Sequence, residues 1–254
     1  MKLHMLVLED AKQVNEEHTP VYTKIEYLRH KRRKNLPPLF NRNFYLCRMI
    51  EEELKGIDID GSGRITICAH QDHRYSPGQE KYICDHYFHI SIYYLEQEQI
   101  DAIEKAIDEG TESIVIEGIL RDALLDIAHR SNCSADVVKR IETAFECIIN
   151  SHFVREDRIA KLTKRSQSTG LTAQVYRVLS EETGEGWHIK ITDRKGNVLH
   201  RETIDDRPCY VNKLGSRLYD KAEWRGDTFV IIEQFGKVVY SIDMKEEKFR
   251  EEKQ

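Results

Sequence analysis

Arg155–Gly170 has the sequence REDRIAKLTKRSQSTG, in which a charged stretch gives way to small polar residues. This composition is typical of a linker or a domain boundary. Helical spacing of apolar residues dominates before it, whereas alternating, strand-like patterns dominate after it. Strands grouped apart from helices predict an α+β fold rather than a doubly wound parallel sheet. A Rossmann-type site is therefore not expected, and we assign no cofactor.

The segment 171–244 is predicted to form an antiparallel β-meander. The predicted strands are Leu171–Leu179, Trp187–Thr192, Val198–Thr203, Thr228–Glu233 and Lys237–Asp243. Hairpin turns at Arg194–Asn197 and Phe235–Gly236 join neighbouring strands. The charged residues Lys245–Gln254 are expected to be frayed or to form a short exposed helix.

Residues 1–165 are predicted to form a mixed region with a β-hairpin and about four helices, either separate from 171–244 or packed with it as one domain. Lys2–Leu8 has a strand pattern, and a first helix is expected from a cap at Asn41 or Asn43 to Gly56. Three helical patterns follow the hairpin: one around Ile100, Ile103 and Ile107, one over Glu112–Arg130, and one opening at Ser134. The second is apolar nearly all round, which predicts a central, buried helix.

The hairpin is expected to pair Arg64–His70 with Tyr82–Tyr94, because both alternate and Ser76-Pro77-Gly78 lies between them. In the second strand, alternate residues share a face. The face predicted to be buried carries Tyr82, Cys84, His86, Phe88, Ile90 and Ile92.

Composition predicts a soluble cytoplasmic protein. The chain has 254 residues, no apolar run long enough for a membrane span, and an N-terminal segment unlike a signal peptide. Its six cysteines are scattered without a C-x-x-C pair, which favours a reducing compartment. The formal net charge of −5 argues against a general nucleic-acid binder and suits a basic protein partner.

Asp58–Thr66 resembles the calcium loop of EF-hand proteins over its first nine positions. Asp58, Asp60 and Ser62 match ligand positions, and Gly63 matches the sharp turn. The twelfth position of an EF-hand loop is a glutamate that binds calcium through both oxygens, and here this position is Ala69. The favoured interpretation is therefore a turn whose aspartates bond their own backbone, and we assign no metal.

Histidines form two H-x-x-H pairs, His70 with His73 and His86 with His89, near Cys68 and Cys84. Zinc is a natural hypothesis for such residues, but positions three apart on a strand point to opposite faces. We expect one semi-buried histidine, His86, and several surface histidines. Base stacking on an exposed strip of Tyr87, His89 and Tyr93 is an alternative, as is a polar outer sheet face.

The one notable basic cluster is Arg29, Lys31, Arg32, Arg33 and Lys34. Such a run is more often a solvated loop than a phosphate-binding arm, although the second role would make the chain a nucleic-acid-binding regulatory module.

Four catalytic signatures are missing from the sequence: G-x-S-x-G, the Walker A loop, H-E-x-x-H and G-x-G-x-x-G. A site assembled from distant residues would leave no such trace. A metal-dependent hydrolase or nuclease using the 64–94 histidines with Asp72 and Asp85 therefore remains an alternative. The sequence leaves enzymatic activity open and favours its absence.

Two stretches carry a resemblance, namely the helix end Glu51–Lys55 followed by the Ile65–Ile67 strand, and the Trp224–Ile231 hairpin. Their order resembles immunity proteins of bacterial polymorphic-toxin systems, which bind and neutralise a cognate toxin. The resemblance implies recognition by surface complementarity, with an acidic face covering a basic toxin domain. The candidate acidic residues are Glu96, Glu98, Glu181, Glu182, Glu185, Asp205 and Asp206.

Overall fold

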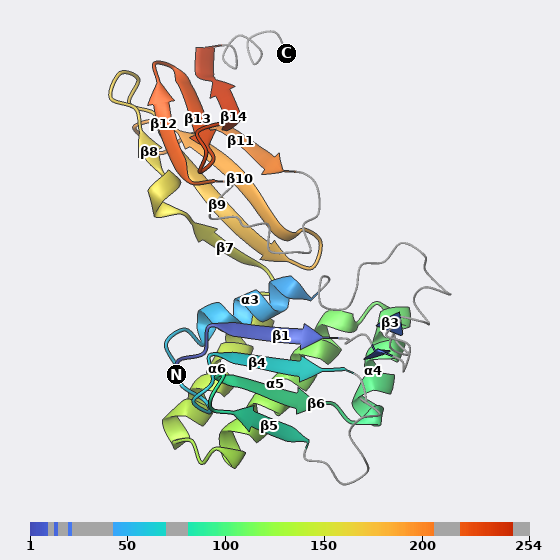
Figure 1. Cartoon of the computed structure of the whole chain (residues 1–254). Helices are drawn as coiled ribbons and strands as arrows, with labels where there is room; N and C mark the ends of the chain where they lie inside the picture. The colour runs from blue at the N-terminus through green and yellow to red at the C-terminus, as the bar shows by residue number, and fades with distance from the viewer. Residues whose placement is uncertain (10–12, 15–19, 22–42, 70–80, 206–218, 246–254) are drawn as a thin grey trace. The chain divides into compact units, whose positions relative to one another are not determined.

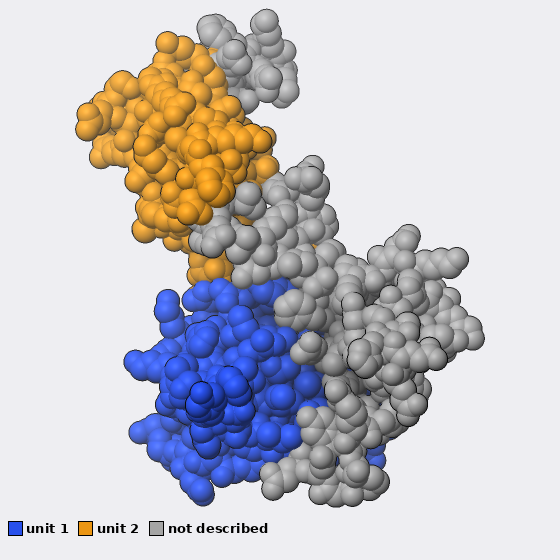
Figure 2. Space-filling view, in the orientation of Figure 1, with its two compact units in different colours: residues 1–154 blue, residues 155–254 orange. Residues whose placement is uncertain are grey.

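The computed structural model describes residues 1–9, 13–14, 20–21, 43–69, 81–205 and 219–245 (Figure 1). The chain divides into two compact units, Met1–Val154 and Arg155–Gln254 (Figure 2). Within the described residues, the α-helices belong to the first unit, and the second is built from antiparallel strands. The α+β class predicted from the sequence is therefore confirmed.

The first unit contains a four-stranded mixed sheet with the order β1-β4-β6-β5. Its strands are β1 (Met5–Glu9), β4 (Arg64–Cys68), β5 (Tyr82–Asp85) and β6 (Ile90–Tyr94). β1 and β6 both pair with β4 in parallel, and β5 pairs with β6 antiparallel. A separate short pair joins β2 (Gln13–Val14) to β3 (Pro20–Val21).

The helices described alongside this sheet lie at the predicted places: α3 (Phe44–Glu53), α4 (Gln97–Glu109), α5 (Glu112–Arg130) and α6 (Ala135–Asn150). α3 lies between β1 and β4 in the chain and packs against β1. α5 packs between α4 and α6, as its apolar surface predicted. Its Asp126 accepts a hydrogen bond of 2.9 Å from the Tyr93 hydroxyl of β6, so α5 faces the sheet.

The prediction that 64–70 and 82–94 form a hairpin is wrong, although 64–68 does pair with 90–94. β4 runs parallel to β6, and the hairpin lies within 82–94, because the chain reverses at residues 86–89. The face assignment for this segment is wrong for the same reason. In β6 the buried residues are Ser91 and Tyr93, whereas Ile90 and Ile92 are half-buried.

In the second unit, two antiparallel sheets enclose one core. The first has the order β11-β10-β9-β7, with β8 also on β9, and the second has the order β12-β13-β14. Their bounds are β7 (Arg155–Arg158), β8 (Lys164–Arg165), β9 (Thr172–Ser180), β10 (Gly184–Thr192), β11 (Val198–Asp205), β12 (Lys221–Arg225), β13 (Thr228–Ile232) and β14 (Val238–Asp243). A 3₁₀ turn, η1 (Ala160–Leu162), separates β7 from β8.

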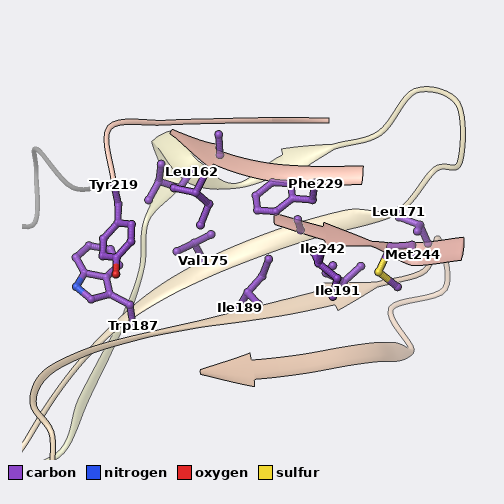
Figure 3. Close-up of a cluster of buried hydrophobic side chains, with 13 residues drawn as sticks. Leu162, Leu171, Val175, Trp187, Ile189, Ile191, Tyr219, Phe229, Ile242 and Met244 are labelled. Carbon is purple, nitrogen blue, oxygen red and sulfur yellow. The ribbon is translucent and has the colours of Figure 1, made fainter. Parts of the chain in front are cut away.

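Alternate residues of these strands fill the core, as the period of a half-buried strand requires (Figure 3). Trp187, Ile189 and Ile191 of β10 are buried together with Phe229 and Ile231 of β13. The predicted meander is thus present as two meanders, one in each sheet.

Arg155–Gly170, predicted as a linker, belongs to the second unit. β7 pairs with β9, and the boundary between the units lies at residues 154 and 155. The predicted terminal segment lies outside the described residues after Lys245.

Candidate functional site

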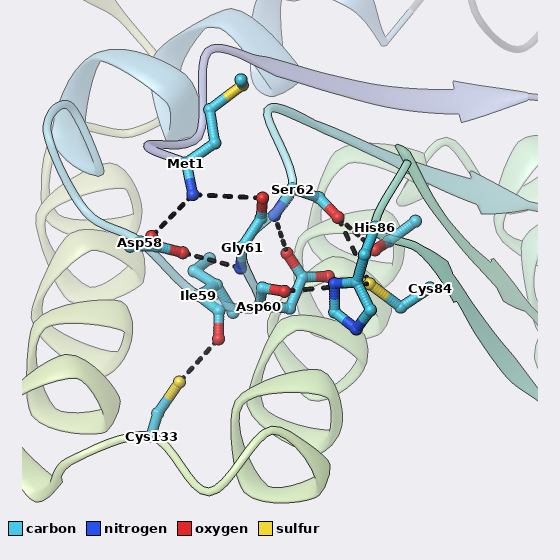
Figure 4. Close-up of polar contacts among 10 residues, drawn as sticks. Met1, Asp58, Ile59, Asp60, Gly61, Ser62, Cys84, His86 and Cys133 are labelled. Atoms are coloured by element: carbon cyan, nitrogen blue, oxygen red, sulfur yellow. Dashed lines mark hydrogen bonds and ion pairs between the residues drawn. The ribbon is translucent and has the colours of Figure 1, made fainter. Parts of the chain in front are cut away.

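Two neighbouring segments of the first unit hold several of the residues that the sequence selected: the loop 58–63 between α3 and β4, and the turn 86–89 between β5 and β6. Figure 4 shows how Ser62, Cys84 and His86 bring them together. The Gly63 and Arg64 N–H groups both donate to the His89 carbonyl, at 3.0 and 3.3 Å. The turn is therefore tied to the start of β4.

The aspartates of the loop bond the loop itself. Asp58 Oδ1 accepts the Gly61 N–H at 2.7 Å, and Asp60 Oδ1 accepts the Ser62 N–H at 2.8 Å. The α-ammonium of Met1 lies 2.8 Å from Asp58 Oδ2 and holds the pKa of that carboxyl below its usual range. These contacts match the self-bonded turn that the sequence favoured over a calcium site.

Asp60 also anchors β5, since its Oδ2 accepts a hydrogen bond of 2.8 Å from the Tyr82 hydroxyl. Burial, together with the neighbouring Asp60 carboxylate, raises the pKa of Tyr82. Tyr82 therefore stays protonated and keeps donating across the physiological range.

Cys84 and His86 form a contact that sequence analysis did not anticipate. The Cys84 Sγ lies 3.5 Å from His86 Nδ1 and 3.6 Å from Ser62 Oγ. Ser62 in turn contacts Ser91 Oγ at 2.6 Å. A thiol beside an imidazole is the first requirement of a nucleophilic dyad. The period-two pattern of 82–94 carries a signal for this pair, because Cys84 and His86 fall on one predicted face.

The histidines do not converge on a common point. His86 contacts Cys84, whereas His89 adopts a left-handed backbone with φ of 54°. Both are exposed, so the prediction of a semi-buried His86 is wrong, because this residue lies in the turn and not within a strand. In the described part of the chain, no three His, Cys, Asp or Glu side chains come together as a metal site would need. His70, Asp72 and His73 lie outside the described residues.

The turn itself carries two aromatic side chains in solvent. Tyr87 is 85% exposed and Phe88 is 65% exposed, and their rings meet edge to face with centroids 4.9 Å apart. Asp85 Oδ1 accepts both of their N–H groups, at 2.9 and 3.0 Å. We call Tyr87 and Phe88 the aromatic tip. The sequence assigned Phe88 to the buried face, and the chain reversal accounts for its exposure.

The acidic candidates do different things in the structure. Glu96 takes part in a capping box with Gln99 at the start of α4 and lies 3.5 Å from Lys81. Glu185 is 8% exposed and lies 3.6 Å from Arg177. Two of these residues therefore have structural roles. Glu98, Glu181 and Glu182 are exposed, as is Glu96.

The other candidates fall outside this description. Asp205 ends β11 without a described side chain, and Asp206 and the basic cluster 29–34 lie outside the described residues.

Comparison of the chain with family models, with curated proteins and with solved structures finds no match in any of the three. Among the described helices, none combines the length and apolar character needed to cross a bilayer.

Proposed function

We propose that this chain is a protein-binding protein that docks its partner on the aromatic tip, and that it acts as an immunity protein against a toxin domain. The observation that carries the proposal is the exposure of Tyr87 and Phe88 side by side. Aromatic residues supply large contact areas and are enriched among the residues that dominate binding energies.

The backbone under the tip favours binding because it is already ordered. Asp85 fixes two turn N–H groups, and the His89 carbonyl accepts two more from the start of β4. A segment held in one conformation loses less conformational entropy when it binds. The tip is therefore suited to insert into a pocket of a partner.

The class of partner comes from the resemblance to immunity proteins, which rests on Glu51–Lys55, Ile65–Ile67 and Trp224–Ile231. The exposed acidic side chains Glu98, Glu181 and Glu182 and the net charge of −5 suit a basic toxin domain. In this proposal the aromatic tip supplies affinity, and acidic residues speed the encounter.

The test is recovery of the partner with tip variants. The full chain is used to capture proteins from its native host, and the affinity of the purified partner is then measured. We expect the double substitution Tyr87→Ser and Phe88→Ser to weaken binding by about tenfold or more, since truncating an aromatic residue that dominates an interface costs about 2 kcal/mol or more.

Phe235→Ser is the matched control, because Phe235 is 88% exposed on the β13–β14 turn of the second unit. This variant should bind as the wild type does. Equal affinity of the tip variant and the wild type would refute docking on the tip. A captured partner whose toxicity the chain does not relieve in co-expression would refute the immunity role alone.

A further inference from the structure

The two edges of the sheet in the first unit differ in how they are covered. At the β1 edge, the Leu6 N–H donates to Glu51 Oε1 of α3 at 2.7 Å, and α3 packs along the strand. At the other edge, β5 pairs with β6 and with no other described strand. Figure 1 shows β5 as the last strand on its side of the sheet. An open edge offers backbone groups to another strand.

The register identifies those backbone groups. The Tyr94 N–H donates to the Lys81 carbonyl at 2.8 Å, and Ile83 lies opposite Ile92. Hydrogen-bonded pairs alternate along an antiparallel ladder, so Lys81, Ile83 and Asp85 turn their backbone groups toward β6. The N–H and C=O groups of Tyr82 and Cys84 consequently point away from the sheet.

We propose that a second copy of this chain pairs with this edge, β5 against β5, in an antiparallel register centred on Ile83. In that register Tyr82 lies opposite Cys84 of the partner subunit, and each such pair exchanges two backbone hydrogen bonds. All four outward-pointing groups of each strand are then used. The two sheets join into one, related by a twofold axis.

Side-chain charge selects this register. When Ile83 is at the centre, Lys81 lies opposite Asp85 of the partner subunit, and the symmetric pair is formed as well. Opposite charges across neighbouring strands are stabilising. A shift of two residues in either direction keeps the backbone pairing but removes both charge pairs.

Both charged groups can take part. Asp85 bonds the turn N–H groups through Oδ1, which leaves Oδ2 to accept from a lysine. Lys81 lies 3.5 Å from Glu96, and its ammonium has three donors. Because only the short β5 strand of each copy takes part, the contact is small and the dimer is reversible.

Charge reversal tests the proposal on the full chain by sedimentation over a range of concentrations. The wild type should move from the monomer mass of 29.9 kDa toward twice that value as concentration rises. Lys81→Glu and Asp85→Lys should each weaken the dimer about tenfold or more, because each puts like charges opposite each other twice. An equimolar mixture of the two variants should regain dimers, since the carboxylate introduced at position 81 of one copy then faces the ammonium introduced at position 85 of the other.

Asp85→Lys also removes the acceptor of the turn N–H groups, so its far-UV circular dichroism and unfolding midpoint are compared with the wild type. Cys84→Pro is a second variant, since proline removes an N–H that points away from β6 and is tolerated at a sheet edge. It should abolish the dimer. A monomeric wild type at the highest concentration, or dimers that neither Cys84→Pro nor charge reversal weakens, would overturn the proposal.

Discussion

Glu51 links a helix to a sheet edge through one buried carboxylate. It accepts the Leu6 N–H at 2.7 Å and forms an ion pair with Arg48. Burial raises the pKa of the Glu51 carboxyl above its usual value. The Leu6 N–H and the Arg48 guanidinium lower this pKa, but their effect is smaller than that of burial. The helical spacing of apolar residues places Glu51 on the polar side of α3. The sequence alone therefore could not predict that its carboxylate accepts the Leu6 N–H.

Glu51→Ala should lower the free energy of unfolding by about 1–3 kcal/mol, because it leaves a buried N–H without its acceptor. Denaturant titration of the full chain measures the change. Glu52→Ala is the control, since Glu52 is a half-buried neighbour on the same helix. Equal stability of the wild type and Glu51→Ala would show that the contact contributes nothing.

The raised pKa of Glu51 also gives a pH dependence. In the folded state this carboxyl holds its proton to a higher pH than in the unfolded state. Its contribution to stability is therefore full below the ordinary glutamate pKa and is lost as pH rises through the folded-state value. Stability relative to Glu51→Gln should fall as pH rises from about 4.5 toward neutrality. A difference that stays constant with pH would contradict this assignment.

Among the elements, the four described helices and the strands β9, β10, β11, β13 and β14 could be found in the sequence because their apolar periods run over many residues. The strand β12 was not predicted. The 82–94 hairpin could not be found either, since the turn 86–89 contains no glycine, proline or asparagine to interrupt the alternation. The turn forms because Asp85 accepts two N–H groups and His89 takes a left-handed conformation. The parallel pairing of β4 with β6 depends on tertiary packing, so the local sequence pattern could not predict it either.

The strands β7 and β8, which lie within Arg155–Gly170, also could not be predicted from the local sequence pattern. β7 has the sequence REDR, which contains no apolar residue and therefore lacks the alternation that predicts a strand. It lies at the edge of its sheet. Charged residues are common on edge strands, because they discourage further pairing. The charged sequence therefore gave no sign of the strand that begins at Arg155.

Phe229 is fully buried between the two sheets of the second unit (Figure 3). Phe229→Ala should cost about 3–5 kcal/mol, the range for loss of a buried aromatic ring. Both tryptophans of the chain, Trp187 and Trp224, lie in this unit, so their fluorescence reports its unfolding. Phe235→Ala is the control and should change stability by less than about 0.5 kcal/mol. Similar costs for the two variants would contradict the observed core.

At the scale of the whole molecule, the α+β class followed from the separation of helical and strand patterns. Of the candidate site, the sequence predicted the self-bonded loop and the exposure of Tyr87, but not the contact of Cys84 with His86 or the exposure of Phe88. Tyr93, predicted to be exposed beside Tyr87, is buried. The exposure of Phe88 depends on where the strand ends and the chain turns. If the turn is misplaced by one residue, every later side chain is assigned to the opposite face of the sheet. The acidic residues were selected one by one from the sequence, whereas their roles depend on neighbours such as Lys81 and Arg177.

Hydrogen exchange of the full chain, with and without its captured partner, tests docking on the aromatic tip most directly. If the partner docks on the tip, hydrogen exchange at residues 82–94 should be slower in the complex, with the largest change in the turn 86–89. The turn Phe235–Gly236 should exchange equally in both states. Unchanged exchange over 82–94, with protection at residues 181–185 instead, would show that the partner binds elsewhere.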